Sequence, residues 1–248
     1  MTEITKTLKD LGTITIKEID RATAKEMIVK HHYSHKLGSN HGILNYGIFR
    51  DGELLGCASY GYMMNPKAKI FTSDVVGGVM LELNRLWISD DLGRNAESYL
   101  IATSIKLIRK TAPNVVAIQS FADGRLGCGT IYKASNFRYY GYHYTLFYEV
   151  IKTGEVLHHI TVENQKNTNY IQYNTALLNG DYRAFRVKTH RYIYPLHKSF
   201  RLTIAKEQPY PTYSKGIEYY DKKINRELIQ RNIEKVRKQK EERENKRN

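Results

Sequence analysis

The feature that most constrains the fold is a long amphipathic helix followed at once by an apolar strand. Residues 95–112, NAESYLIATSIKLIRKTA, place apolar side chains on one helical face, namely Leu100, Ile101, Ile105 and Ile108. Pro113 ends this segment, and residues 114–122, NVVAIQSFA, read as a buried strand. This succession of helix and strand indicates an α/β protein.

The remaining chain continues the alternation of strands and helices. Asp20 is a predicted N-cap for a helix that runs to His32, and Asp51-Gly52 is a strong hairpin signal. Strands are predicted over residues 13–19, 41–62 (two, joined at that turn), 79–89 and 139–151, and a short helix over 127–137. This order is similar to the layout of the Gcn5-related acyltransferase (GNAT) fold, a mixed, mostly antiparallel central sheet flanked by helices. A fold alone does not fix a function.

The net charge indicates the class of partner. The chain carries 39 Lys or Arg against 25 Asp or Glu, a formal charge of +14, together with 20 tyrosines. A basic surface attracts polyanions, and tyrosine can stack on bases, so nucleic acid is the expected partner. The alternative is a solvated basic surface that binds nothing.

Cysteine use and hydropathy indicate the compartment. Cys57 and Cys128 make neither a disulfide framework nor a zinc pair, so a reducing cytosol is expected. No apolar run reaches the roughly 20 residues of a membrane span, and the N-terminus lacks the features of a signal peptide.

Residues 30–42, KHHYSHKLGSNHG, gather four of the nine histidines around Tyr33. Three interpretations compete. His32 can be an acid–base group, because histidine titrates nearest to neutral pH. Alternatively, one or more of His31, His32 and His35 can join Asp123 in holding ferrous iron, a metal that imidazole and carboxylate suit. The third interpretation is a polar loop whose histidines face DNA. Of this group, only His32 and Tyr33 are expected to belong to a site.

Three segments make the interpretation more specific: HHYSH (31–35), ELNRLWISDDLGRNAES (82–98) and SFADGRLGCGTIYKASNFRYYG (120–141). Together, and in this order, they resemble the bacteriophage Mom family of DNA-modifying proteins, a divergent branch of the acyltransferase superfamily. The resemblance spans roughly Ala24 to Leu202. It implies a transferase that converts adenine in double-stranded DNA to N6-carbamoylmethyladenine, which shields phage DNA from restriction. It also implies action in the cytoplasm of the host bacterium.

The resemblance implies a set of site residues. The matched positions are His32, Tyr33, Arg85, Ser98, Asp123 and Tyr132. Because adenine N6 is a poor nucleophile, its modification needs proton removal and an electrophile held close. His32, Tyr33, Asp123 and Tyr132 are the expected catalytic residues. Asp123 is expected to accept a proton from N6 or to hydrogen-bond it, and Tyr132 to act as a general acid or to position substrate.

Each of these roles has a plain structural alternative. Asp123 can instead cap the turn that follows it, and Tyr132 can be a packing tyrosine. Arg85 lies on a central strand and needs a partner. Glu82 is one candidate, but residues three apart face opposite sides of a regular strand, so a bulge or an outside partner is required.

The cofactor is left open by the residues. Arg85, Asn95 and Ser98 are the expected cofactor-binding residues, since the first turn of a helix favours anions such as the pyrophosphate of coenzyme A. The usual acyltransferase loop is Arg/Gln-x-x-Gly-x-Gly/Ala, whereas this chain has DLGRNAES, with one glycine and the acidic Glu97. Acyl-CoA is therefore in doubt as the donor, and ferrous iron is the other cofactor considered.

Modification of N6 is expected to require an extruded base, at a cost of a few kcal/mol. Cations alternate with aromatic residues over 183–201, as on a surface that grips DNA. The expected nucleic-acid-binding residues are Arg183, Arg186, Lys188, Arg191, Lys198 and Arg201, with His190 beside them. The oligomeric state is left open, a dimer included.

The end of the chain has a different composition. Residues 217–248 hold eleven Lys or Arg against seven Asp or Glu, which predicts a protruding charged helix, either along DNA or as a solubilising tail. The predicted organisation is a GNAT-like catalytic domain over residues 1–205, followed by a linker and a basic C-terminal helix over 206–248.

Two other functions compete with DNA modification. One is an ordinary GNAT N-acyltransferase that uses acyl-CoA on a small-molecule or protein amine. The other is a nucleic-acid-binding protein that keeps the fold without catalysis.

Overall fold

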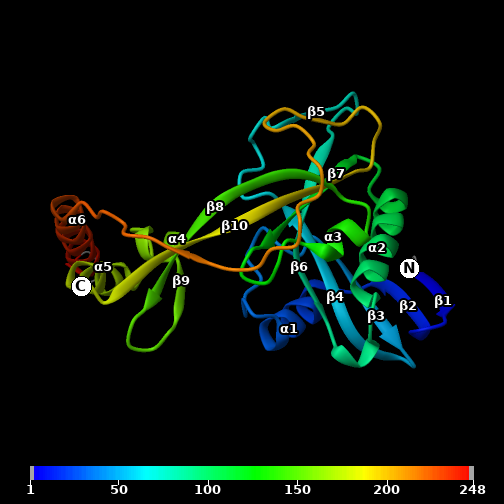
Figure 1. Ribbon diagram of the computed structural model, residues 1–248, viewed down its shortest axis with the longest axis horizontal. Helices are drawn as coiled ribbons and strands as arrows, with labels where there is room; N and C mark the ends of the chain where they lie inside the picture. The colour runs from blue at the N-terminus through cyan, green and yellow to red at the C-terminus, as the bar shows by residue number, and fades with distance from the viewer. Residues whose placement is uncertain (1–2, 246–248) are drawn as a thin grey trace. The chain divides into compact units, whose positions relative to one another are not determined.

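A computed structural model describes residues 3–245 of the 248-residue chain (Figure 1). The chain forms two compact units. The first comprises the residues up to 122 together with 128–142 and 190–213. The second comprises 123–127, 143–189 and the chain from 214 onwards. The catalytic domain predicted over residues 1–205 contributes to both units, and the boundary after residue 205 stays a prediction.

Most helices and strands before residue 137 belong to the first unit. They are β1 (Glu3–Leu8), β2 (Gly12–Glu18), α1 (Arg21–His31), β3 (Leu44–Arg50), β4 (Glu53–Tyr62), β5 (Phe71–Thr72), β6 (Val79–Ile88), a 3-10 turn (Asp90–Leu92), α2 (Ala96–Thr111), β7 (Val115–Asp123) and α3 (Thr130–Ala134). The strands β8 (Arg138–Val150) and β10 (Tyr182–Pro195) contribute to both units. Later in the chain, β11 (Arg201–Leu202) pairs with β5. The second unit adds β9 (Val156–His158), α4 (His159–Glu163), α5 (Tyr170–Asn179), β12 (Glu218–Tyr219) and α6 (Arg226–Asn245).

The strands follow the order β1-β2-β3-β4-β6-β7-β10-β8-β9, with β12 beside β10. The pairs from β1 to β6 and the β8–β9 pair are antiparallel, whereas β6 and β7 run parallel. The predicted fold class is confirmed, namely a mixed, mostly antiparallel sheet flanked by helices, with a C-terminal helix after it.

Two helices cover opposite faces of the sheet in the first unit. Cys57 of β4 lies in an apolar cluster with Ala24 and Ile28 of α1, while its neighbour Ala58 packs in the main core that holds the buried face of α2. Consecutive strand residues point to opposite faces, so α1 and α2 lie on opposite sides of β4. The apolar residues predicted for α2, such as Leu100, are buried in that core.

The helix cap and the hairpin turn predicted from the sequence are both present in the structure. The Asp20 side chain accepts a hydrogen bond from the Thr23 N–H (2.9 Å) and caps α1. Asp51 and Gly52 adopt positive φ angles of 52° and 82° between β3 and β4. Left-handed backbone at two successive residues matches the twist of a two-residue hairpin, which explains why this dipeptide occurs here.

The parallel strands β6 and β7 separate after a short stretch of pairing. Their register runs from Val79 opposite Val115 to Glu82 opposite Gln119. Beyond that point β6 continues to Ile88 and β7 to Asp123. Polar side chains of both strands gather where the strands separate, and these side chains form the candidate site.

The second unit contains two helices that the sequence analysis does not predict, α4 and α5, and the C-terminal helix that it does predict, α6. The segment ENQKNTN, expected to be a polar stretch, is followed by α5, and the C-terminal helix α6 begins at Arg226. Helix α6 buries Ile233 and Val236 against Tyr170 of α5, and Lys240 Nζ donates to the Thr168 carbonyl over 3.0 Å. This helix therefore packs on α5 and is not a free tail.

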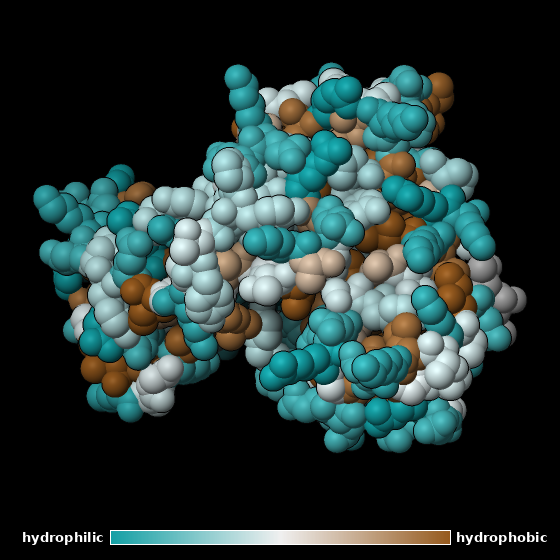
Figure 2. All heavy atoms as spheres, turned by 45° about the vertical axis from the view of Figure 1, so that its right-hand side comes forward, coloured by the Kyte–Doolittle hydropathy of each residue, from teal (hydrophilic) through white to brown (hydrophobic). Residues whose placement is uncertain are grey.

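The exposed surface is mixed in character. On the face drawn in Figure 2, hydrophobic residues form small patches separated by hydrophilic ones. Of the helices described, none combines the length and the apolar character that a membrane crossing requires.

Candidate active site where two parallel strands separate

Arg85 lies beside a β-bulge in β6. Ser59 of β4 pairs with Arg85 and Tyr60 pairs with Leu83, so Asn84 is the extra residue. The Arg85 guanidinium donates to two carbonyl oxygens, that of Lys36 (3.0 Å) and that of Asn84 (2.6 Å). The sequence analysis requires either a bulge or an outside partner for Arg85. The structure has both, the bulge at Asn84 and the carbonyl of Lys36.

Glu82 presents a largely desolvated carboxylate to the same region. Its Oε1 accepts from the Asn84 amide (3.2 Å) and its Oε2 from the Gln119 amide of β7 (2.9 Å). Burial raises the pKa of this carboxyl, and the two amides and the positive charges of Arg85 and Arg191 oppose that rise. Glu82 is therefore a better proton acceptor, once ionised, than an exposed glutamate.

Tyr132 and Ser120 fill the space between the separating strands. The Ser120 hydroxyl donates to the Leu83 carbonyl of β6 (3.0 Å) and lies 2.9 Å from the Tyr132 hydroxyl. Tyr132 is 8% exposed, and burial raises its pKa to about 12. Its phenol is thus protonated at neutral pH and can donate a proton or a hydrogen bond.

His32 forms the C-cap of α1 and is buried, with 7% exposure. Its Nδ1 accepts from the Ser34 N–H (3.1 Å), which leaves the ring proton on Nε2 in the neutral form. Burial first, and then the charges of Arg85 and His35, lower its pKa to about 4. Tyr33 is 59% exposed and its ring centroid lies 4.2 Å from that of His32. His32 is thus neutral around pH 7.

The other histidines of this loop are engaged separately. His31 stacks on Trp87 with ring centroids 4.2 Å apart, and His35 Nδ1 lies 2.9 Å from the Val29 carbonyl. Helix α1 ends at His31, and His35 has a φ of 46°, so the two do not share a helical face. Within residues 3–245, no three His, Cys, Asp or Glu side chains converge as metal ligands. His32 and Asp123 belong to different units, so the iron site considered for them stays a prediction.

Asp123 lies at the end of β7, in the second unit. Its Oδ1 accepts from the Arg125 N–H (2.9 Å), and both carboxylate oxygens accept from the Arg125 guanidinium, the shortest contact being 2.5 Å. The guanidinium also lies over the Phe147 ring, 4.2 Å from its centroid. This carboxylate thus makes the contacts of a turn-capping aspartate, and its predicted catalytic role stays a prediction.

The start of α2 carries the expected cofactor-binding residues. Asn95 is the N-cap in a left-handed conformation, with φ 69° and no side-chain capping bond. The Ser98 hydroxyl donates to the Asn95 carbonyl (3.0 Å), so its proton is not available to a phosphate. Acidic residues precede and begin the helix, namely Asp90, Asp91 and Glu97. Their charges oppose the binding of a pyrophosphate, so this loop does not fit coenzyme A.

The predicted nucleic-acid-binding residues divide between the two units. Lys198 and Arg201 belong to the first unit and line a basic hollow with Arg109 and Arg138. Arg191 is half-buried, its pKa is lowered by burial, and its guanidinium lies 5.2 Å from the Phe121 ring centroid. His190 is buried and hydrogen-bonded to the Tyr139 hydroxyl (3.0 Å). Arg183, Arg186 and Lys188 belong to the second unit.

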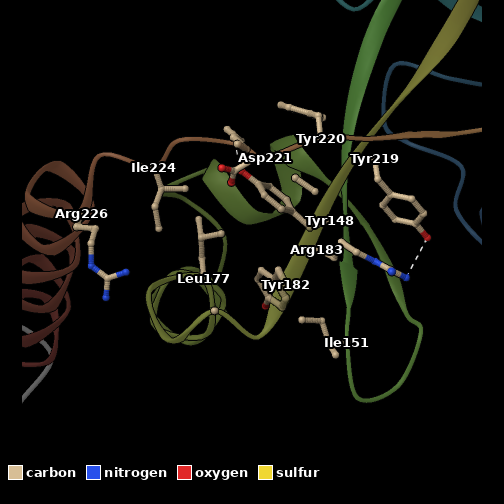
Figure 3. Close-up of a pocket in the computed structure, with 13 residues that line it drawn as sticks. Tyr148, Ile151, Leu177, Tyr182, Arg183, Tyr219, Tyr220, Asp221, Ile224 and Arg226 are labelled. Atoms are coloured by element: carbon tan, nitrogen blue, oxygen red, sulfur yellow. Dashed lines mark hydrogen bonds between the residues drawn. The ribbon is translucent and has the colours of Figure 1, made fainter.

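Arg183 and Arg186 are exposed and held by aromatic and acidic neighbours. Arg183 lies over the Tyr219 ring (4.0 Å) and donates to Glu149 (2.7 Å). Arg186 lies over the Tyr144 ring (4.1 Å) and donates to Glu218 (3.0 Å). In Figure 3 the Arg183 guanidinium points to the Tyr219 hydroxyl, at the edge of a hollow of ≈ 660 Å³ that Tyr148, Tyr182 and Tyr220 also line. Cations fixed on aromatic rings are suited to phosphate contacts.

Part of the polar cluster between β6 and β7 is not predicted from the sequence. The sequence predicts Glu82 only as a possible partner for Arg85 and assigns no role to Gln119 or Ser120. A usable signal was present, because all three are polar residues inside strands that otherwise read as apolar. Glu82 and Gln119 meet only because β6 and β7 are neighbours in the sheet, and that strand order cannot be predicted from the sequence.

Comparison with known structures gives limited similarity. A probable acetyltransferase from Staphylococcus epidermidis aligns with a TM-score of 0.42 and 9% identity, over 74% of this chain and 99% of that one. NAA60 from Arabidopsis thaliana, in complex with a bisubstrate analogue, aligns with a TM-score of 0.45 and 13% identity, over 73% of this chain and 97% of that one.

Comparison of sequences gives a closer match. The methylcarbamoylase mom of Escherichia phage Mu is 36% identical over 208 residues, which is 80% of this chain and 83% of that protein. That relative is, by its name, a group-transferring enzyme, in agreement with the expected transferase. The family described as "Mom protein family" matches residues 13–212. The resemblance indicated by the three sequence motifs is thus confirmed, and the chain belongs to the Mom protein family.

Proposed function

We propose that this chain modifies adenine in double-stranded DNA at N6, producing N6-carbamoylmethyladenine or a related N6 adduct. In a phage-infected bacterium this product would protect phage DNA from restriction enzymes in the host cytoplasm. The observation that carries the proposal is the 36% identity over 80% of the chain to the phage Mu methylcarbamoylase.

The arrangement of side chains at the β6–β7 gap supports a reaction on an amine. N6 needs a proton acceptor when it attacks an electrophile, and the leaving group needs a proton donor. A desolvated carboxylate, Glu82, and a protonated buried phenol, Tyr132, belong to the same unit and interact electrostatically. The neutral His32, with its Nε2–H, adds a hydrogen-bond donor that keeps its state between pH 5 and 8.

The charge of the chain supports DNA as the substrate. A formal charge of +14 favours contact with a polyanion, because each phosphate contact releases counterions. Arg183 and Arg186 are exposed cations held in place by tyrosine rings, and they are proposed phosphate contacts. The exposed Tyr33 beside His32 can stack on an extruded base.

Nucleoside mass spectrometry of plasmid DNA tests the proposal. Plasmid is recovered from bacteria that express the full chain, the Asp123→Ala variant or a control with an exposed carboxylate removed, Asp10→Ala. We expect a new deoxyadenosine derivative with the wild type and the control, and its loss with Asp123→Ala. A mass gain equal to a carbamoylmethyl group replacing one hydrogen would identify the product.

Two results would contradict parts of this proposal. Unmodified DNA from cells with abundant, folded protein would overturn DNA modification and leave acyl-CoA-dependent transfer to another amine as the function to test. Modification by Asp123→Ala at the wild-type level would keep DNA modification and remove Asp123 from the catalytic residues.

A further inference from the structure

The Glu82 carboxylate is held from two sides by amides that are themselves buried. Asn84 is 8% exposed and Gln119 is 4% exposed, and each directs its amide N–H to a different oxygen of Glu82. An amide that donates to a carboxylate places its own oxygen beside that carboxylate. The cluster therefore presents several acceptor atoms at one point between β6 and β7.

Three buried atoms of this cluster lack a hydrogen-bond partner among residues 3–245. They are two acceptors, Oε1 of Gln119 and Oδ1 of Asn84, and one donor, Nη1 of Arg191, whose charge acts on Glu82. A buried polar group without a partner is energetically costly, so such groups call for an explanation. Two unpartnered acceptors on the amides that hold this carboxylate, and an unpartnered donor whose charge acts on it, are complementary to a ligand that carries both donors and an acceptor.

An amino-bearing nucleobase has this pattern. Adenine presents the N6 amine as a donor next to a ring nitrogen that accepts. Cytosine presents the same pair in a smaller ring, and guanine presents it at its 2-amino group and N3, whereas thymine has no amine. The cluster therefore favours the amino-bearing bases over thymine, and adenine is the one that the proposed function requires.

We propose that Glu82, positioned by Gln119, binds the exocyclic amine of an extruded adenine and accepts its proton during group transfer. This inference rests on the function proposed above and assigns residues to its substrate recognition. Gln119 Oε1 accepts from the second N6–H, and Arg191 donates to a ring nitrogen of the base.

The proton and electron balance of the step is simple. The N6 lone pair forms a bond to the electrophilic carbon of a carbamoylmethyl donor that carries an anionic leaving group. The bond between that carbon and the leaving group breaks, and its electron pair departs with the leaving group. The N6 proton moves to the Glu82 carboxylate, which returns it to solvent after the product leaves.

The surroundings of Glu82 suit a proton acceptor. The groups whose charge acts on it are Arg85 on the same strand and Arg191 on β10, and it acts in turn on Tyr132. Burial raises the pKa of Glu82, so its ionised form binds a proton more strongly than an exposed carboxylate does. Asp123, by contrast, has both oxygens bonded to Arg125.

Glu82→Gln is the informative substitution, because it keeps the size of the side chain and removes the proton acceptor. The measurement is modified deoxyadenosine in plasmid DNA from cells expressing the wild type, Glu82→Gln or the exposed control Glu53→Gln. Each purified protein is also tested for thermal unfolding and for binding to a short duplex DNA. We expect Glu82→Gln to reduce modification by at least about 100-fold while it binds duplex DNA as the wild type does. The control Glu53→Gln should match the wild type in both measurements.

The outcomes separate this inference from the function on which it rests. If the wild type modifies DNA and a folded Glu82→Gln variant does so within about threefold, Glu82 is not the proton acceptor and the inference is overturned. If the wild type leaves DNA unmodified, the proposed function fails, and the inference fails with it. Should Glu82→Gln not fold, Glu82→Asp keeps the carboxylate, and its complete inactivity in folded form would overturn the inference, whereas activity reduced about tenfold would support it.

Discussion

Gln119 of β7 donates its side-chain amide to the Glu82 carboxylate of β6 across 2.9 Å, at the last residue pair before the two strands separate. The two residues are 37 positions apart in sequence, with helix α2 between them. The short parallel pairing brings them together, and the separation of the strands beyond it leaves room for Ser120 and Tyr132. Hydrogen-bonding side chains from β6, β7 and α3 therefore lie together where the two strands separate.

Replacing Gln119 with leucine should destabilise the protein and impair the site. Glu82 would keep its burial and lose one of its two amide donors, which is expected to cost about 1–3 kcal/mol in the free energy of unfolding. Urea denaturation at pH 7.5 measures that change. The exposed Gln172→Leu serves as control, and equal stability of both variants would show that the bond to Glu82 contributes little.

Replacing Tyr132 with phenylalanine removes a single hydroxyl from the gap. The loss of its contact with Ser120 should cost about 1 kcal/mol of stability, while the ring keeps its packing against Phe137 and Tyr192. If the phenol is the general acid, modified deoxyadenosine should fall by about 100-fold. The exposed Tyr62→Phe is the matched control. Full activity of Tyr132→Phe would assign Tyr132 to packing alone.

Much of the fold could be predicted from local sequence. The N-cap at Asp20, the hairpin at Asp51-Gly52 and the apolar face of α2 each follow from the chemistry of a few neighbouring residues. Strand β1 was not predicted, because its pattern EITKTL is short and mostly polar. Helix α5 was missed because the polar stretch before it indicates a loop, and α5 depends on packing against α6.

The candidate site could be predicted only in part. A strand that reads as apolar indicates that Arg85 needs a partner, and the bulge at Asn84 was among the expected solutions. The cluster around Glu82 was not predicted, since it requires β6 and β7 to be neighbours and to separate after Gln119. His31 and His35 do not lie on one helical face, because α1 ends at His31 and the chain turns at once.

His32 should make stability depend on pH in acid. Its folded-state pKa of about 4 lies below the ordinary value of 6.5, so the unfolded chain takes up the proton first as the pH falls. The stability contributed by the neutral ring is therefore complete above pH 6.5 and is lost as the pH falls towards 4, by about 3 kcal/mol in total.

Urea denaturation at pH 7.5 and pH 4.5 tests this dependence. Wild-type protein should lose about 2–3 kcal/mol more between the two pH values than His32→Gln, which cannot titrate. The exposed His143→Gln is the control and should keep the wild-type loss. Identical losses in wild type and His32→Gln would show that His32 is not buried in its neutral form.

Arg183 and Arg186 should contribute to DNA binding without regard to sequence. Removing both in Arg183→Ala/Arg186→Ala is expected to lower affinity for duplex DNA and to reduce the slope of log K against log salt by about 2, since each phosphate contact contributes about 0.9. Fluorescence anisotropy at several salt concentrations measures that slope. The charge-matched control Lys6→Ala/Lys9→Ala alters two exposed cations of the first unit. An unchanged slope in the arginine variant would place the phosphate contacts elsewhere.

Helix α6 should stabilise the second unit, although its composition suggests a solvated tail. Ile233 is 6% exposed and packs in an apolar cluster with Tyr170 and Val236. Ile233→Ala would leave a cavity between α5 and α6, which is expected to cost about 2–5 kcal/mol in the free energy of unfolding. Leu228→Ala, on the exposed side of the same helix, is the control and should change stability by less than about 0.5 kcal/mol. Circular dichroism during heating measures the unfolding temperature of each variant. Equal unfolding temperatures for Ile233→Ala and Leu228→Ala would mean that α6 does not pack on α5 in solution.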